Sequence, residues 1–249
     1  MKKRAFGRTK AFASIVFAML RIPLWLAVPE SQRRKHERAF FSRITRGFGI
    51  SIEQCGVRSG APATLFVMNH ISWADIPVMM AILDADFVAK ADMLDWPVIG
   101  ILARRFNPVF VARNEQHRSH LQADSIRQRL NAGRPVILCP EGTTSDGTSI
   151  LPFRTSLFAA ADAATAIQPV IIRYLTADGT GLTAERQREV AWIDDDDLLA
   201  GAARLARFKT MARVDFLPPV IGATDRKILA DNIRQPMLTA YAATPNRSR

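Results

Sequence analysis

Short apolar runs alternate with longer segments of helical pattern from residue 50 to about residue 240. Apolar runs of roughly four to eight residues are typical of buried strands, and longer amphipathic segments are typical of helices. The expected strands are residues 50–57, 64–68, 86–90, 108–113, 135–139, 167–174, 190–193 and 213–220, and the expected helices are residues 72–83, 93–105, 116–132, 154–164, 194–208 and 224–240. This alternation predicts an α/β fold with a single mixed sheet flanked by helices.

The length of 249 residues suits one such domain over residues 49–243, preceded by a segment of different composition over residues 1–48 and followed by a loose tail over residues 244–249. The two cysteines, Cys55 and Cys139, are far apart and form no paired motif. A disulfide framework and a cysteine zinc site are therefore not expected, and a reducing compartment fits.

Positive charge is concentrated at the start of the chain. Residues 1–60 contain thirteen lysines and arginines and three acidic residues, so this part carries +10 of the net charge of +11. Such asymmetry indicates a polyanionic partner, either nucleic acid or anionic lipid headgroups. The uninterrupted apolar run at residues 11–20 favours lipid, because a nucleic-acid arm has no use for it. We therefore expect no nucleic-acid partner.

Residues 11–28 are expected to dip into a membrane and not to cross it. They reach only the lower length limit for a spanning helix, and they contain Arg21 and Pro23. A second helix is expected from Ser31 to Gly47, with Phe40, Ile44 and Phe48 spaced by four residues among several arginines. This two-helix membrane-associating segment suits the anionic cytoplasmic face of the inner membrane. A secretory signal is the alternative, but the basic cluster at residues 33–46 opposes translocation.

A histidine and an aspartate follow the expected strand at residues 64–68 within the segment Asn69-His70-Ile71-Ser72-Trp73-Ala74-Asp75. One turn of chain could bring the Asp75 carboxylate to the His70 imidazole, and a histidine held in this way accepts a proton from a hydroxyl near neutral pH. The same residues also fit a helix capping box, with Ser72 as N-cap and Asp75 three residues later. The spacing supports both interpretations.

A second polar break, Pro140-Glu141-Gly142-Thr143-Thr144, follows the expected strand at residues 135–139. The two breaks together suggest one active site at the ends of two strands.

Four motifs in order give a resemblance to a known family. Asn69 to Asp75 resembles the Asn-His-x-Ser-x-x-Asp block of the glycerolipid acyltransferases, the family of 1-acylglycerol-3-phosphate O-acyltransferases. The later blocks are similar to Phe110-Val111-Ala112-Arg113, Pro140-Glu141-Gly142-Thr143 and Gln168-Pro169-Val170, so the resemblance covers about residues 66–172.

The resemblance implies an O-acyltransferase of lipid biosynthesis. His70 would be the general base on the hydroxyl of a lysolipid such as 1-acyl-glycerol-3-phosphate, and Asp75 would orient its imidazole. The acyl donor would be a thioester of acyl-carrier protein or coenzyme A, and no cofactor or metal is implied. The implied acceptor-binding residues are Arg113, Glu141, Gly142, Thr143, Thr144 and Arg154. Arginine suits a phosphate because it donates bidentate hydrogen bonds.

The sequence departs from the family pattern at Thr144, where the third block usually has a phosphate-binding arginine. Arg154 matches a basic position downstream and could replace that cation. The Glu-Gly-Thr-Thr version also resembles a branch that acylates lyso-ornithine lipid, whose headgroup has no phosphate. Both acceptors stay open, and a lipid-binding protein without catalysis is the alternative outside enzymes.

Other residue patterns have simpler explanations. His117 and His120 have no third metal ligand nearby, and Asp194 to Asp197 read as an acidic helix start. Ser72 is not in a Gly-x-Ser-x-Gly motif, which argues against a serine hydrolase.

Overall fold

The computed structural model describes residues 28–90, 108–111, 119–193, 196–220 and 225–243, together with Thr9, Ala13, Val16, Phe17, Leu20 and Gly100. Within these residues the strands are β1 (Ile50–Gly56), β2 (Thr64–Met68), β3 (Asp86–Lys90), β4 (Val109–Val111), β5 (Val136–Leu138), β6 (Ala166–Thr176) and β7 (Thr210–Phe216). The helices are α3 (Glu30–Gly47), α4 (Asp75–Ile82), α6 (Ser119–Asn131), α7 (Ala184–Val190), α8 (Leu198–Leu205) and α9 (Arg226–Ala243), with short 3-10 turns η3 (Thr155–Phe158) and η4 (Ala161–Ala163).

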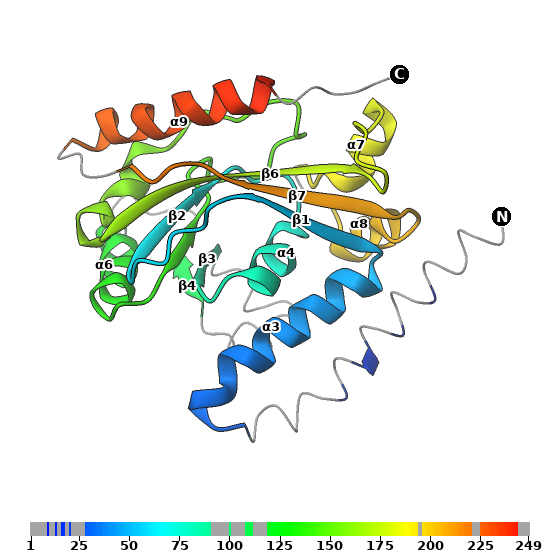
Figure 1. Cartoon of the computed structure of the whole chain (residues 1–249), viewed down its shortest axis with the longest axis horizontal. Coiled ribbons are helices and arrows are strands. Elements are labelled where there is room, and N and C mark those ends of the chain that lie inside the picture. Colours follow the sequence, from blue (N-terminus) through cyan, green and yellow to red (C-terminus); the bar gives the residue numbers. More distant parts are fainter. Residues whose placement is uncertain are drawn as a thin grey trace.

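The described strands form one sheet in the order β1-β7-β6-β2-β5-β3-β4 (Figure 1). Every neighbouring pair is parallel except β6 with β7, so β1 and β7 run opposite to the other five strands. The predicted single mixed sheet is therefore confirmed. The ends of β2, β5, β3 and β4 meet at one edge of the sheet, and the starts of these strands meet at the opposite edge.

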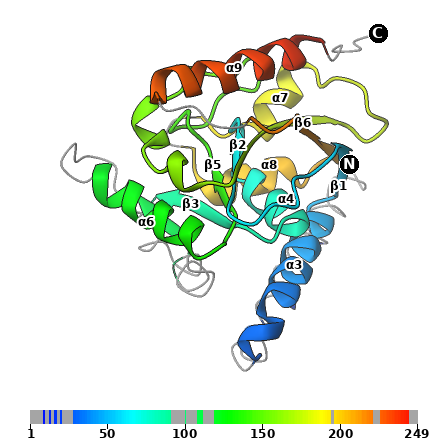
Figure 2. The same cartoon turned by 60° about the vertical axis from the view of Figure 1, so that its left-hand side comes forward.

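Helices cover both faces of the sheet, with α9 on one side and α3 and α4 on the other (Figures 1 and 2). Side chains of β2 alternate between the two cores that result. Phe66 and Met68 belong to the core beneath α3 and α4, whereas Leu65 and Val67 belong to the core beneath α6 and α9. All five residues of β2 are buried, because the strand lies inside the sheet with apolar layers on both faces.

Helix α3 is part of the core. The helix packs on α4 and β1. Phe41 and Phe48, which directly follows the helix, are buried in the core, and Phe40 and Ile44 pack against that core. The apolar side chains at four-residue spacing, which were expected to contact a membrane, therefore pack on the α/β domain. Of the helix expected over residues 11–28, most positions lie outside the described residues; Arg43 of α3 lies 4.4 Å from the ring centre of Phe17.

No helix among the described residues has the length and apolarity that a membrane crossing needs.

Several predicted elements differ from the structure. The expected strand at residues 190–193 is wrong, because Val190 ends helix α7 and the next residues bond to loops instead of to a strand. The expected helix at residues 154–164 is replaced by η3 and η4, and β7 begins three residues before the predicted strand at 213–220. The helix expected at residues 93–105 and the tail at 244–249 lie outside the described residues.

Candidate active site

The residue before His70 fixes the point at which the chain leaves β2. The buried Asn69 amide donates to the carbonyl of Ile172 on β6 at 3.0 Å and accepts from the N–H of Ile172 at 2.8 Å. The side chain thus extends the β2–β6 ladder beyond its last pair, Met68 with Val170. Because this bond pattern is tied to the sheet, the position of His70 at the strand end is rigid.

His70 and Asp75 are in direct contact. Nδ1 of His70 lies 2.7 Å from Oδ2 of Asp75, and the Asp75 side chain is fully buried while that of His70 is 19% exposed. An ionised carboxylate can only accept, so Nδ1 carries the proton and Nε2 keeps its lone pair. The structure therefore brings the predicted pair together in the arrangement of a histidine base.

Three more donors hold the Asp75 carboxylate. The N–H groups of Ile71 and Ser72 donate to Oδ2 at 2.7 and 3.0 Å, and the Tyr174 hydroxyl donates to Oδ1 at 2.6 Å. The predicted capping box is wrong in register, because α4 begins at Asp75 and the Ser72 hydroxyl accepts from the N–H of Ala74 in the turn before it. Asp75 still reaches back to Ser72 as the second half of such a box would.

Tyr174 is a site residue that the sequence did not reveal. It lies on β6, and burial raises the pKa of its hydroxyl well above the usual value, so it remains a proton donor to Asp75. Its sequence separation from Asp75 is 99 residues, and the apolar run around it predicts only a buried strand. Only the pairing of β6 with β2 brings the two side chains together.

Glu141 joins the two polar breaks. It follows β5, the parallel neighbour of β2, and its carboxylate accepts from the N–H of His70 at 2.8 Å and from that of Leu151 at 2.9 Å. The N–H of Ser145 donates to the His70 carbonyl at 2.8 Å. Burial raises the pKa of Glu141 to about 7, against the opposing effect of the two N–H donors. The predicted meeting of both breaks at one site is thus observed.

Gly142 and Arg154 lie against each other beside Glu141. Gly142 has a φ of +69°, and a Cβ at this position would lie 2.6 Å from Nε of Arg154. The N–H of Arg154 donates to the carbonyl of Pro140 at 2.8 Å, which holds the two segments together. Within the described structure the exposed Arg154 guanidinium has no hydrogen-bond or ion-pair partner, so its donors are available to an anion. The neighbouring Thr143 is also exposed.

Thr144 has a structural bond in place of the family's cation. Its hydroxyl donates to the carbonyl of Trp192, and the N–H of Trp192 donates to the carbonyl of Ile71 at 2.9 Å. The segment at Trp192 therefore ties the His70 loop to the Glu141 loop.

Arg113 lies outside the described residues. Strand β4 ends two residues earlier, at Val111, and its parallel pairing with β3 places that end at the same sheet edge as His70 and Glu141. Its contact with an acceptor remains a prediction.

Two potential nucleophiles near His70 are not activated. Ser72 is fully buried, and burial raises the pKa of the Cys139 thiol well above its usual value. A thiol that stays protonated is a poor nucleophile. In the part of the chain that the structure describes, no three His, Cys, Asp or Glu side chains gather into a metal site, and His117 lies outside that part.

The chain is similar to known acyltransferases along most of its length. The family model described as Acyltransferase matches residues 52–173. The lyso-ornithine lipid O-acyltransferase of Brucella abortus is 36% identical to this chain, and the aligned region spans 88% of this chain and 87% of that protein. The 1-acyl-sn-glycerol-3-phosphate acyltransferase of Neisseria meningitidis serogroup B is 32% identical to this chain, and the aligned region spans 86% of this chain and 83% of that protein.

The fold also resembles a solved structure. The crystal structure of the 1-acyl-sn-glycerophosphate acyltransferase from Thermotoga maritima superposes with a TM-score of 0.68 over 99% of this chain and 98% of that one. At 17% sequence identity, this likeness concerns the fold.

Proposed function

Because the chain belongs to the acyltransferase family, we propose that it transfers a fatty acyl group from a thioester to the free hydroxyl of a lysolipid. The observation that carries the proposal is the 2.7 Å contact between Nδ1 of His70 and Oδ2 of Asp75. This contact leaves Nε2 as the proton acceptor, and the partial exposure of the ring lets a hydroxyl reach it.

In the proposed reaction Nε2 of His70 takes the proton of the acceptor hydroxyl as its oxygen attacks the thioester carbonyl. The C–O bond forms, the C–S bond breaks, and the proton passes from His70 to the departing thiolate. Asp75 stabilises the imidazolium that exists between these two proton transfers. No enzyme nucleophile, metal or prosthetic group is needed, because a thioester is already activated.

The acceptor headgroup is proposed to lie over Gly142 and Arg154. The close approach of Arg154 to Gly142 leaves a cation with unused donors beside the strand ends that carry His70 and Glu141. Thr143 is exposed at the same place, and Arg113 is the further cation expected there. Both oxygens of Glu141 accept backbone N–H groups, so we assign it to holding the His70 loop in place.

The first candidate acceptor is 1-acyl-glycerol-3-phosphate, which would give phosphatidic acid as the product. One observation favours lyso-ornithine lipid as a second candidate: Thr144 stands where a phosphate-binding arginine is usual, and its hydroxyl is already bonded to Trp192. A relative at 36% identity has the name lyso-ornithine lipid O-acyltransferase. Equal amounts of the two acceptors in one reaction would identify the preferred product by mass spectrometry.

The donor is proposed to be a thioester of acyl-carrier protein or coenzyme A, and the place of reaction the cytoplasmic face of the inner membrane. The basic charge of residues 1–48 and the apolar run at residues 11–20 support this location.

The decisive experiment measures acyl transfer by purified protein from a radiolabelled acyl thioester. His70→Ala should lower kcat by roughly 10²–10⁴, because that is the usual contribution of a positioned base. His36→Ala is the matched control, since His36 lies on α3 and bonds to the carbonyl of Gln32. Unchanged transfer in His70→Ala would refute the role of His70. Lysolipid binding without transfer by the unmodified protein would instead support a non-catalytic lipid-binding protein.

A further inference from the structure

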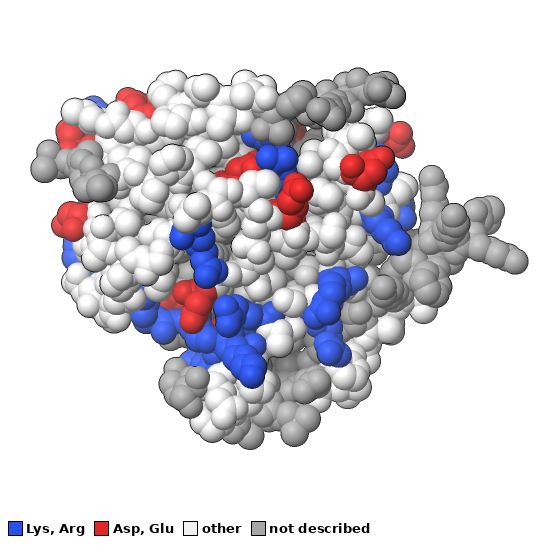
Figure 3. Space-filling view, viewed as in Figure 1, with Lys and Arg blue, Asp and Glu red and all other residues white. Residues whose placement is uncertain are grey.

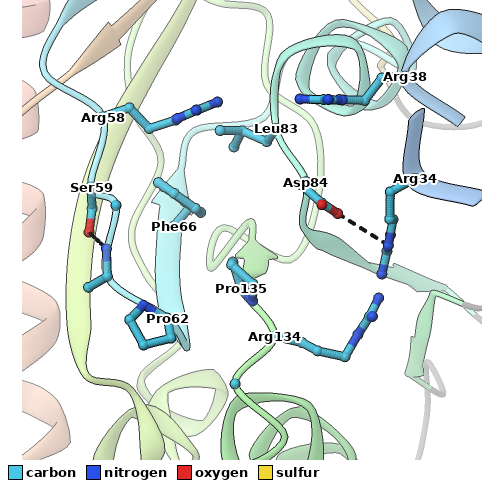
Figure 4. Close-up of a pocket in the computed structure, with 13 residues that line it drawn as sticks. Arg34, Arg38, Arg58, Ser59, Pro62, Phe66, Leu83, Asp84, Arg134 and Pro135 are labelled. Atoms are coloured by element: carbon cyan, nitrogen blue, oxygen red, sulfur yellow. Dashed lines mark hydrogen bonds and ion pairs between the residues drawn. The ribbon is translucent and has the colours of Figure 1, made fainter. Parts of the chain in front are cut away.

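A groove of about 450 Å³ lies at the sheet edge opposite to His70 (Figure 4). Ala61 and Pro62 precede β2, Asp84 precedes β3, and Pro135 precedes β5, so the starts of three parallel strands form its base. Helix α3 supplies the facing wall through Arg34 and Arg38. The groove is therefore a site separate from the one around His70 and Glu141.

The groove is basic. Its lining contains the four arginines Arg34, Arg38, Arg58 and Arg134 and one acid, Asp84. Arg34 pairs with Asp84 and with the buried Asp86, and Arg134 also pairs with Asp86, so the positive charge that has no acidic partner among the described residues is that of Arg38 and Arg58. Figure 3 shows lysine and arginine side chains gathered on the part of this molecular face where α3 lies. A concave surface with one sign of charge concentrates ions of the opposite sign.

Two of these arginines, Arg34 and Arg134, are held in place by the buried carboxylate of Asp86. Asp86 is 2% exposed, and its Oδ1 lies 2.6 Å from a terminal nitrogen of Arg34 and 2.7 Å from one of Arg134. Its Oδ2 accepts from Nε of Arg134 at 2.8 Å. Because the buried carboxylate fixes both guanidinium groups, less side-chain entropy is lost when a ligand binds next to them.

The other two arginines have unused donors. One terminal nitrogen of Arg58 donates to the carbonyl of Ile82 at 2.8 Å, which orients the guanidinium and leaves its other nitrogens without partners among the described residues. Arg38 is exposed and has no bonding partner in the same part of the chain. The close-up shows Arg38 and Arg58 extending toward each other from opposite sides of Leu83 (Figure 4).

The base between the arginines is apolar. Phe66 and Leu83 are each 2% exposed, and Pro62 and Pro135 lie beside them. A solvated row of charges does not need such a base, whereas a ligand with an anionic head and a less polar body fits both parts. Arginine forks match the oxygens of phosphate with paired hydrogen bonds better than they match a single halide ion.

We propose that this groove is a second ligand site that binds a phosphate group between Arg38 and Arg58. The phosphate belongs either to the headgroup of an anionic lipid or to a soluble phosphate compound. Arg34 and Arg134, which are paired with Asp86, line the groove beside the phosphate, and Phe66 and Leu83 contact the adjoining part of the ligand. The site works independently of the acyl-transfer chemistry, because none of its lining residues belongs to the site at His70.

The test compares two double variants of the full chain. Arg38→Ser with Arg58→Ser removes the unused donors, and Lys209→Ser with Arg226→Ser removes the same charge from exposed positions outside the groove. Binding of inorganic pyrophosphate is measured by titration calorimetry, and binding to phosphatidylglycerol and phosphatidylcholine vesicles is measured by flotation. The groove variant should bind its anionic probe roughly tenfold more weakly or worse, because each charge-assisted bond contributes on this scale.

The two probes separate the sources of the phosphate. If the groove variant binds pyrophosphate more weakly than the control variant but binds phosphatidylglycerol equally well, the ligand is a soluble phosphate compound. If it binds only phosphatidylglycerol more weakly, the ligand is a lipid headgroup. Equal binding of both probes by the groove variant and the control variant overturns the proposal. Thermal unfolding and retained acyl transfer confirm that each variant is folded, and Arg38→Lys with Arg58→Lys keeps the charge while it removes the paired donors.

Discussion

At the scale of single residues, Asp75 is the hydrogen-bond partner of the His70 ring. Its carboxylate accepts hydrogen bonds from the His70 ring, from the N–H groups of Ile71 and Ser72, and from Tyr174. An asparagine has only one accepting oxygen, so at least one of these donors would face an NH₂ group. Three of the four donors converge on Oδ2, so the asparagine oxygen is expected to take that position and its NH₂ group to face the Tyr174 hydroxyl. His70 then keeps its tautomer but loses the negative charge beside its ring.

Asp75→Asn should therefore lower kcat by roughly 10²–10⁴, because a neutral amide does not stabilise the imidazolium that forms on the proposed base. Steady-state acyl transfer is the measurement. Asp162→Asn is the matched control, because the side chain of Asp162 is 70% exposed and pairs with Arg127 instead of with a residue of the candidate site. An Asp75→Asn enzyme with the activity of the control would show that the negative charge of Asp75 does not assist His70 in the reaction.

Glu141 should make stability depend on pH. Burial raises its pKa from 4.5 to about 7, so the folded protein favours the protonated form. The stabilisation is complete below pH 4.5 and is lost as the pH rises to about 7, which amounts to about 3 kcal/mol. Urea unfolding at several pH values should show this fall in the unmodified protein and a flatter profile in Glu141→Gln.

The exposed Glu185→Gln is the control for that comparison, and it should keep the pH profile of the unmodified protein. Parallel profiles for all three proteins would mean that Glu141 does not titrate in this range. Above pH 7 Glu141→Gln lacks the second accepting oxygen that the ionised carboxylate offers to the N–H groups of His70 and Leu151.

At the scale of elements, helix α9 holds the loop that carries Glu141. Tyr241 donates to the carbonyl of Gly147 at 2.6 Å, and Arg234 donates to the carbonyls of Leu151 and Ile150 at 2.9 and 2.8 Å. Leu151 in turn donates to Glu141. Burial and its surroundings raise the pKa of Tyr241 to about 12, so the hydroxyl stays a donor at physiological pH.

Tyr241→Phe should loosen this loop without unfolding α9, because the ring that lies under Arg173 is retained. Loss of one hydrogen bond of about 1 kcal/mol predicts amide exchange of residues 145–151 faster by roughly fivefold. Hydrogen exchange by mass spectrometry measures it, and Arg226→Ala in the exposed first turn of α9 is the control. Equal exchange in the two variants would refute the tie between α9 and the loop.

Two strands, β2 and β3, were predicted to the residue. β2 is a run of five buried residues that is followed by the polar residues Asn69 and His70, so its pattern and its length agree, and β3 is a short segment that begins at Asp86 and ends at Lys90. Residues 190–193 look equally apolar, yet the N–H and carbonyl of Trp192 pair with Ile71 and Thr144. Local pattern does not reveal whether the partner is a strand or a loop.

The same limit applies to helices and to the site. α7 has a polar sequence without an apolar stripe, and only the cap at Thr183 marks its start. His70 and Asp75 were predictable because five residues separate them, whereas Asn69 and Tyr174 act through β6, about a hundred residues away. Contacts of this kind follow from strand order, which the sequence did not determine.

At the scale of the whole molecule, the structure defines where the start of the chain can be cut. Phe41 of α3 and Phe48, which directly follows the helix, are buried, and Glu37 is 1% exposed and bonded to Arg33 and Arg34. A deletion that includes α3 would expose this core and unfold the domain. In contrast, Leu20 is 72% exposed and Phe17 is 44% exposed, so these two apolar side chains leave surface for another contact.

Removal of residues 1–28 should therefore abolish binding to phosphatidylcholine vesicles at high salt, where arginine contributions are screened and apolar contact remains. Acyl transfer to acceptor dispersed in detergent should persist, because α3 and the sheet are intact. Removal of residues 1–10 is the control, since it deletes five lysines and arginines but keeps the apolar run. The control should float with the vesicles, and flotation of both proteins would show that membrane contact depends on the α/β domain itself.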